Sequence, residues 1–485
     1  MFKPFIGIVF EVKKPEKPPS FNKKVGFTFA ALILYLMMLN IPVAGITTDP
    51  NQPDPFFALR AILASQRGSL AELGIGPIVT AGMILQLLVG SKIIKVDFND
   101  EEDKLLYTGA QKMMSILMTI FEAIAYIAGG AYGTEIQKSL QTQAVVILQL
   151  TMAGAAIMLL DEIVQKGYGL GSGISLFIAA SVSFRVVRGS FDITSVNACP
   201  NIQAPDSNCL YPSGAILFFA QSIARNNIYQ GLWHPEINNS SDMFNLLATV
   251  IIFAVVIYFE SMRIEIPVQH ADHRMPARYP IKFLYVSNIP VILVSALFAN
   301  VYLISNVLRS NYSNDPGTMG TITRFFGVWD TPEGSNQQVP IAGLASFTTP
   351  PRGIQGVATH PLQAMGYLIL MVIFSAIFAM IWVETAGMSS RDVARQLIDA
   401  DMQIPGFRRN EVIIEKYLQQ YIPYAAFLGG VFIGLLAALA DFMGAIGSGT
   451  GILLTTGIIR QYYEILAKER LAELNPGVAG LFGLT

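Results

Sequence analysis

The 485-residue chain is 52% hydrophobic and only 14% charged, whereas soluble domains average roughly 25% charged residues. This composition excludes an ordinary soluble domain and predicts a polytopic membrane protein. The formal net charge of −2 gives no indication for or against nucleic acid, so the distribution of charge along the chain is more informative.

The first apolar run covers 25–44 and follows a lysine-rich stretch. At about 20 residues it is longer than the ~7–15-residue core of a cleaved signal peptide, and no Ala-x-Ala site follows it. We therefore expect an uncleaved first span, with 1–24 as a cytoplasmic N-terminal segment.

A helix break precedes the second apolar run. Segment 56–72 is too short and too charged to span a bilayer, and Gly74-Ile75-Gly76-Pro77 then opens a stretch of membrane length. Backbone that stops and restarts at membrane depth is tolerated only where it is buried in protein or lines a cavity. We therefore expect a half-helix folded into a funnel, followed by a span lined with Ile75, Val79 and Thr80. This arrangement indicates a pathway through the membrane.

Runs of nearly 20 apolar residues predict ten spans. Their approximate ranges are 25–44, 75–94, 112–132, 143–163, 170–187, 244–262, 284–306, 362–386, 421–440 and 446–462. They divide into halves at 25–187 and 244–462, with an outer loop at 188–243 between them and a tail at 463–485. Five spans per half give the halves opposite orientations, which permits an inverted repeat, although no repeat is visible residue by residue.

The charges predict which side of the membrane each loop faces. With the N-terminus inside, the inner segments hold most of the 32 Lys and Arg residues, as the positive-inside rule requires. The outer loops, at 185–243 and 305–361, are longer and contain weak glycosylation sequons. Cys199 and Cys209 lie in the first of them and could form a local disulfide if that loop faces outside. We expect both termini to be cytoplasmic.

Motifs for enzymatic chemistry are absent from the sequence. It contains no Gly-x-x-x-x-Gly-Lys-Ser/Thr phosphate loop, and its Gly-Ser-Gly segments lack the first glycine of an intramembrane serine protease motif. His270 and His273 could bind a metal, but a solvated basic loop explains them better. We therefore predict no enzyme, no metal and no cofactor.

Ionisable residues within the predicted spans are few. Secondary transporters usually carry several such groups at mid-membrane, but here only Glu122 lies deep within a span. It is either functional or a neutral packing carboxyl. Asp161, Glu260 and Glu384 lie near span ends, where we expect them to face water. The pattern favours a passive conduit, and a solute permease of the secondary-transporter kind is the alternative.

Two inner loops, at 263–282 and 387–416, are large and basic. They either fix the topology and contact lipid, or form a docking platform for a large anionic partner.

Together these features resemble the SecY family of protein-conducting channel subunits in its archaeal form, which is similar to the alpha subunit of the eukaryotic endoplasmic reticulum translocon. The resemblance covers nearly the whole chain, with departures in the outer loops 185–243 and 305–361. The segments that carry it are Leu73–Gly82, Leu160–Val164, Gly171–Ile174 with Leu176–Ala180, Arg263–Pro267, Tyr279–Phe283, Val286–Leu293, Ala296–Asn300, Trp382–Thr385 and Gly449–Gly451.

The resemblance implies an all-α fold of ten transmembrane helices in two pseudo-symmetric inverted halves of five. It implies that the chain is the central pore-forming subunit, which translocates secretory polypeptides across the cytoplasmic membrane and inserts membrane proteins into it. Expected partners are SecE, a small beta subunit, the ribosome through its rRNA, nascent chains with their signal sequences, and membrane lipids.

The resemblance also assigns roles to individual positions. A plug at 56–72 would close the outer funnel, and it includes Phe57, Leu59, Arg60, Ile62, Leu63, Arg67 and Leu70. A ring of aliphatic pore residues falls on Ile75, Val79, Ile174, Ile178, Ile292 and Leu454. A polar lateral-gate cluster falls on Thr80, Glu122 and Asn300. Ribosome contacts fall on Arg263, Arg274, Arg278, Arg408 and Arg409 in the two inner loops.

Overall fold

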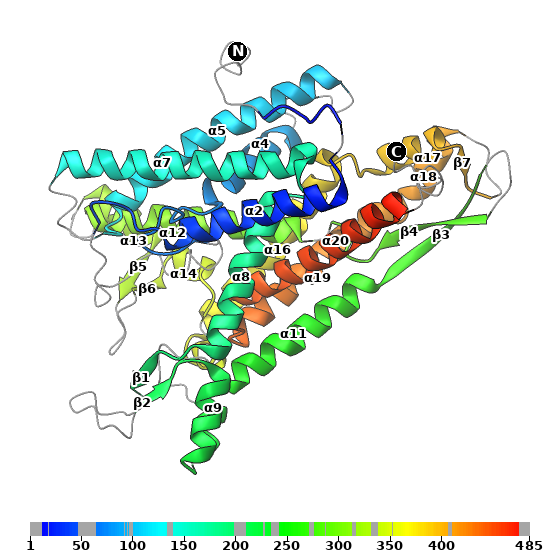
Figure 1. The fold of residues 1–485 in the computed structure, drawn as a ribbon. Coiled ribbons are helices and arrows are strands. Elements are labelled where there is room, and N and C mark those ends of the chain that lie inside the picture. The colour runs from blue at the N-terminus through cyan, green and yellow to red at the C-terminus, as the bar shows by residue number, and fades with distance from the viewer. Residues whose placement is uncertain are drawn as a thin grey trace.

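Most of the chain forms helices (Figure 1). The computed structural model describes residues 12–17, 19–46, 65–91, 93–94, 96, 100–132, 139–197, 210–226, 228–233, 242–270, 276–286, 288–312, 317–330, 338–351, 353–405 and 410–474. The predicted all-helical membrane fold is confirmed in its main body.

Each of the ten predicted spans has a helix among the described residues. These helices are α2 (Phe21–Asn40), α4 (Gly76–Gly90), α5 (Glu101–Ala128), α7 (Leu140–Ile163), α8 (Gly173–Phe191), α11 (Met243–Ser261), α12 (Ile289–Tyr312), α16 (Pro361–Thr385), α19 (Ile422–Phe442) and α20 (Gly449–Leu474). Eight of them are long and apolar enough to cross a membrane on length and composition. The exceptions are α4, which has only 15 residues, and α20, whose second half is charged.

Two helices extend well beyond their predicted spans. Helix α5 begins at Glu101, where the Asp100 side chain accepts a hydrogen bond from the Glu102 amide. Helix α20 continues to Leu474, into the segment predicted as a separate tail. An apolar run predicts only the part of a helix that suits a membrane. Polar turns that extend the same helix beyond that run carry no such signal.

Within the described residues, three small sheets add to the helical fold. The strands are β1 (Ser195–Asn197) with β2 (Leu210–Pro212), β5 (Val328–Asp330) with β6 (Val339–Ala342), and the sheet β4–β3–β7, formed by β3 (Arg263–His270), β4 (Pro276–Lys282) and β7 (Met402–Gln403). The first two sheets lie in the predicted outer loops. The third joins the two predicted inner loops, because Gln269 of β3 pairs with Gln403 of β7.

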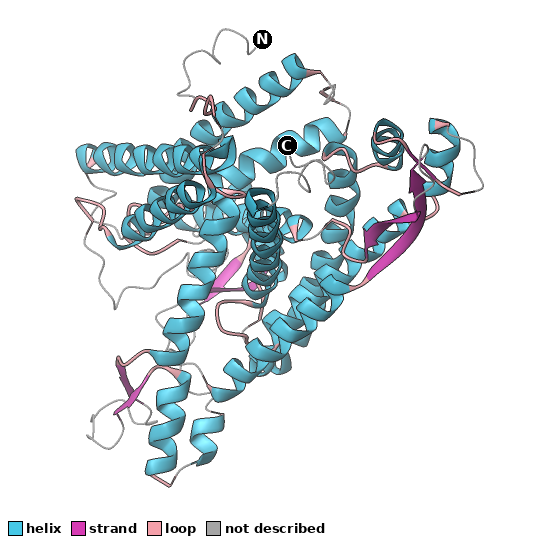
Figure 2. Cartoon of the chain, turned by 45° about the vertical axis from the view of Figure 1, so that its right-hand side comes forward, coloured by secondary structure: helices cyan, strands magenta, loops and turns pink. Residues whose placement is uncertain are grey.

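The joined inner loops have a hydrophobic core of their own. Ile266 and Val268 alternate along β3 and are buried together with Leu397 and Ile414, which belong to α17 (Ser390–Asp399) and α18 (Glu411–Leu418). Figure 2 shows this sheet projecting from one end of the helical body. We call the sheet with α17 and α18 the inner platform.

The described parts of the two long predicted outer loops contain short helices. These are α9 (Ala215–Ala224), α10 (Ile228–Leu232), α13 (Thr318–Phe326), α14 (Leu344–Thr348) and α15 (Gly353–Thr359). A π-helical turn at Val164–Tyr168 follows α7.

Helices α16 and α19 pack closely through glycine. A Cβ atom added at Gly430 would lie 2.7 Å from Ala379 Cβ and 2.9 Å from the Ser375 carbonyl oxygen, both on α16. Small residues allow membrane helices to approach closely and gain van der Waals contact. This contact fixes two helices of the second half against each other.

Replacing Gly430 with Ala should destabilise the protein by about 1–3 kcal/mol, because the added methyl group overpacks a filled interface. The measurement is thermal unfolding of the purified protein in detergent. Gly26→Ala on α2 is the matched control, since nothing lies within 4 Å of the added atom there. Equal melting temperatures for the two variants would contradict the role of Gly430.

Candidate pore and lateral gate

Three helices begin abruptly at the centre of the molecule. Helix α4 starts at Gly76 after Gly74, whose φ is +57°. Helix α8 starts at Gly173 after Gly171, with φ +69°, and α20 starts at Gly449 after two left-handed residues. Glycine adopts a positive φ without steric cost, although Ser448 also adopts one before α20. The first residues of the three helices, Gly76, Gly173 and Gly449, are buried, so each break places the first turn of a helix inside the protein.

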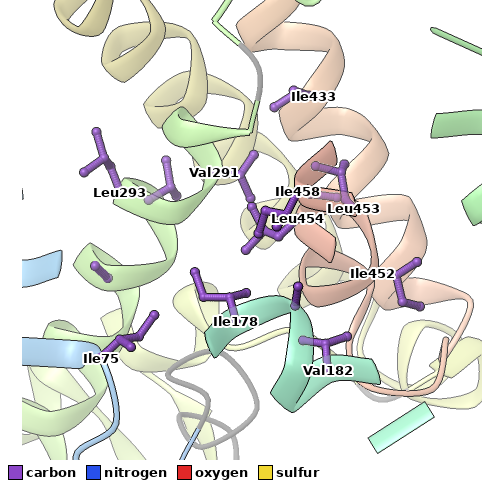
Figure 3. Packing of buried hydrophobic residues seen from close by; sticks show 14 of the residues in the cluster. Ile75, Ile178, Val182, Val291, Leu293, Ile433, Ile452, Leu453, Leu454 and Ile458 are labelled. Carbon is purple, nitrogen blue, oxygen red and sulfur yellow. The ribbon is translucent and has the colours of Figure 1, made fainter. Parts of the chain in front are cut away.

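The six predicted ring residues belong to one hydrophobic cluster. Ile75, Ile178 and Leu454 are buried, at 2%, 2% and 3% exposure, and the other three are partly buried and pack against the same cluster. Figure 3 shows Ile75, Ile178 and Leu454 around one central region, each from a different part of the chain. The structure therefore brings the predicted ring together from both halves.

The three predicted gate residues form a hydrogen-bonded chain. The Thr80 hydroxyl donates to Glu122 Oε1 at 3.3 Å, and Asn300 Nδ2 donates to Thr80 Oγ1 at 3.1 Å. Thr80 and Glu122 are buried, and Asn300 also donates to the Ala296 carbonyl oxygen. Because Thr80 and Glu122 lie on α4 and α5 and Asn300 lies on α12, this chain crosses the boundary between the two halves.

Only the end of the predicted plug is described. Phe57, Leu59, Arg60, Ile62 and Leu63 lie outside the described residues, whereas Arg67 and Leu70 lie in a segment of turns from 65 to 75.

The residues that hold this segment were not predicted from the sequence. Arg185 Nη2 on α8 donates to the Ser65 carbonyl oxygen at 3.0 Å. Glu72 is fully buried, and its Oε2 accepts hydrogen bonds from the Gly68 amide at 3.0 Å and the Tyr132 hydroxyl at 2.6 Å. An arginine within an apolar helix and a glutamate beside a helix break were the available signals.

The described arginines of the β3–β4 hairpin share one acidic partner. Arg278 and Arg263 lie 2.6 and 3.3 Å from Glu265 and are largely exposed. The hydrogen bond from Arg278 holds the pKa of Glu265 below its ordinary value, and that carboxylate raises the pKa of Arg278. Glu265 therefore stays ionised. The predicted contacts Arg274, Arg408 and Arg409 lie outside the described residues, as do Cys199 and Cys209.

Two expectations about acidic residues are wrong. Asp161 and Glu260 are 7% and 8% exposed and do not face water, because neighbouring helices cover these span ends. Asp161 instead accepts a hydrogen bond from the first turn of α8. Glu384 is exposed, as expected.

Comparisons with known proteins match this architecture. The SecY family model matches residues 69–463, and the model for the plug domain of Sec61p matches 33–68. The chain is 43% identical over 475 residues to the protein translocase subunit SecY of Pyrococcus furiosus, covering 98% of this chain and 97% of that protein.

Solved structures are similar along almost their whole length. One, described as "The structure of a protein conducting channel", has a TM-score of 0.79 at 36% identity and covers 99% of both chains. Another, "Sec61 in the Canine ribosome-channel complex from the endoplasmic reticulum", has a TM-score of 0.77 at 35% identity and also covers 99% of both chains.

A double-mutant cycle should detect the hydrogen bond between Thr80 and Glu122. Combining Thr80→Val with Glu122→Ala should give a coupling free energy of roughly 0.6 kcal/mol, and at most about 1.7 kcal/mol, the range for hydrogen bonds between membrane helices. The measurement is denaturant unfolding in mixed micelles. Thr80→Val combined with Thr151→Val on α7 should be additive within about 0.5 kcal/mol. Additivity for both pairs would show that the contact is energetically silent.

Proposed function

This chain belongs to the SecY family, and we propose that it is the central pore-forming subunit of a protein-conducting channel. The observation that carries the proposal is the cluster of six aliphatic residues from both halves, in which all but Ile292 lie at the starts of α4, α8 and α20. The names of the relatives support it, since one is a protein translocase subunit and a structural neighbour is a protein conducting channel.

An aliphatic ring suits a polypeptide better than a solute. Water in a narrow apolar neck gains few hydrogen bonds, so the neck tends to empty and blocks ions without binding them. Side chains such as Ile178 and Leu454 are deformable and form no specific hydrogen bonds, so many sequences can slide past them. A solute permease needs a polar substrate site, and the helix breaks here present aliphatic residues in its place.

The seam between α4, α5 and α12 is proposed as a lateral gate for signal sequences and membrane segments. Thr80, Glu122 and Asn300 are the polar groups that meet there. Polar side chains at a helix seam loosen its apolar packing and admit water, so they set how hydrophobic a segment must be to leave the pore sideways into lipid.

The inner platform is proposed to face the cytoplasm and to dock ribosomes. Its exposed arginines favour the cytoplasmic side of a membrane, and one structural neighbour is described in a ribosome-channel complex. We place both termini on the same side, in the cytoplasmic membrane, and expect SecE and a small beta subunit as partners on the basis of the family resemblance. Copurification of two small membrane proteins with the chain would test the last point, and its isolation alone from native membrane would argue against it.

Polar substitutions in the ring should make the resting channel leak. Changing Ile178, Ile292 and Leu454 to Ser lets water wet the neck, so ion conductance should rise while polypeptide export largely survives. The measurement is planar-bilayer conductance of the purified complex, combined with an export assay. Serine at the lipid-facing positions Leu148 and Ile369, which are 61% and 47% exposed, is the control. A ring variant as tight as the parent would place the seal elsewhere.

An apolar seam should raise the hydrophobicity that a signal sequence needs in order to open the lateral gate. With Thr80, Glu122 and Asn300 all changed to Leu, the closed seam packs better, so weakly hydrophobic signal sequences should fail first. The measurement is insertion efficiency across a series of signals of graded hydrophobicity, with Thr151→Leu on α7 as control. Equal losses for weak and strong signals would remove the gate assignment.

Charge reversal on the platform should weaken ribosome binding. Changing Arg263, Arg278 and Arg408 to Glu replaces attraction to rRNA phosphates with repulsion, and the binding of the parent should fall steeply with added salt. Cosedimentation with ribosomes measures both effects. Arg188→Glu, at the opposite end of α8 from the platform side, should leave binding unchanged. If only Arg188→Glu reduced binding, the proposed orientation would be inverted.

A further inference from the structure

The starts of α8 and α20 are matched in the two halves of the chain. Helix α8 begins at the last residue of Gly171-Ser172-Gly173, and α20 begins at the last residue of Gly447-Ser448-Gly449. Ile178 follows Gly173 by the same number of residues as Leu454 follows Gly449. Two proposed ring residues therefore occupy equivalent places on equivalent helices. The Gly-Ser-Gly pattern is present in the sequence, and the structure shows that both copies start a helix at the same position of the motif.

In the first half a buried carboxylate holds the start of α8. Asp161, near the end of α7, accepts a hydrogen bond through Oδ1 from the Ile174 amide at 2.9 Å. Gln165 Nε2 donates to both carboxylate oxygens, at 2.9 and 2.8 Å. A Cβ atom at Gly173 would lie 2.7 Å from Asp161 Cα. Glycine is therefore what lets the helix start approach this carboxylate.

The second half repeats the arrangement with different neighbours. Asp441, near the end of α19, accepts a hydrogen bond through Oδ1 from the Gly449 amide at 2.7 Å. Its Oδ2 accepts from the Tyr367 hydroxyl at 2.8 Å. A Cβ atom at Gly449 would overlap with Ala440. Asp441 is 7% exposed, the same fraction as Asp161.

Such a contact fixes more than the helix end. The first amides of a helix have no partner within the helix, and a carboxylate near them is favoured by both charge and hydrogen bonding. An amide belongs to the rigid backbone, so holding it sets the height and rotation of the first turns. The ring side chains Ile178 and Leu454 project from the second turn of their helices.

We propose that Asp161 and Asp441 are a matched pair of positioning residues that hold Ile178 and Leu454 in the ring. The proposal rests on the proposed function, because it gives these two carboxylates a part in the resting seal. It predicts that loss of Asp161 lets the start of α8 shift and exposes Ile178. Loss of Asp441 should do the same for the start of α20 and Leu454.

The first experiment does not depend on conduction. A single cysteine replaces Ile178 or Leu454 in a chain whose Cys199 and Cys209 are Ser, and a small thiol reagent labels it in detergent. Asp161→Ala should raise the labelling rate of the cysteine at 178 about tenfold, and Asp441→Ala should do the same at 454. Loss of a helix cap of ordinary strength raises by about this factor the fraction of molecules in which the helix start has shifted. The Asp→Asn variants keep an accepting oxygen and should label close to the parent rate.

Glu162→Ala is the matched control. Glu162 is equally buried and adjacent in the chain, but its ion pairs are with Lys112 at 2.6 Å and Lys166 at 2.9 Å, both of which lie outside α8. Its loss should leave labelling at 178 unchanged. Should an Ala variant fail to fold, Gln165→Leu and Tyr367→Phe loosen the two carboxylates without removing them, and each should speed labelling to a smaller extent.

Bilayer conductance separates this proposal from the proposed function. Asp161→Ala and Asp441→Ala should leak at rest, whereas Glu162→Ala should stay tight. If ring serines leak but both Asp→Ala variants label and conduct like the parent, the positioning role is overturned and the channel function stands. If neither the ring serine variants nor the Asp→Ala variants leak, the ring is not the seal and the proposed function fails. Faster labelling in the Asp→Ala variants would then still support the positioning role of the two aspartates.

Discussion

A helix that begins inside a membrane protein must satisfy its first amide groups without help from bulk water, and the centre of this molecule depends on that constraint. Helices α8 and α20 meet it with the buried carboxylates of Asp161 and Asp441. Because the helix starts are fixed in this way, their next turns can present Ile178 and Leu454 to a common centre. In the proposed channel, these helix breaks are what allow one chain to enclose a narrow apolar neck.

Apolar and polar side chains are kept apart in this arrangement. The neck is aliphatic, whereas the polar chain from Glu122 through Thr80 to Asn300 lies on the seam between the halves. In the proposed channel each kind of surface serves one route: the apolar neck excludes ions without binding the polypeptide tightly, and the hydrogen-bonded seam separates and closes again. The inner platform has its own core around Ile266 and Leu397, so it can engage a partner without disturbing either route.

The spans could be predicted from the sequence because few structures besides a membrane helix need an apolar run of that length. Helix ends were predicted less well, as α5 and α20 show, since polar turns carry no such signal. The β3 hairpin could have been found from the alternation of Ile264, Ile266 and Val268, which the overall basic charge of the loop obscured. Asp161 was expected to face water because a carboxylate near a span end usually does, and its partner amide lies on a different helix. The complete ring and gate sets came from the family resemblance, whereas Ile75, Val79 and Thr80 could also be placed beside a helix break from the residues themselves.

Passage of a polypeptide through the aliphatic ring is the central claim. The most direct test places a photoreactive amino acid at Leu454, and separately at Leu148, which is exposed on the outside of α7, and irradiates complexes that hold a stalled secretory chain. If the ring is the pathway, the probe at 454 cross-links to the secretory chain only when that chain is engaged, and the probe at 148 does not. Cross-links from 148 with none from 454 would contradict the claim.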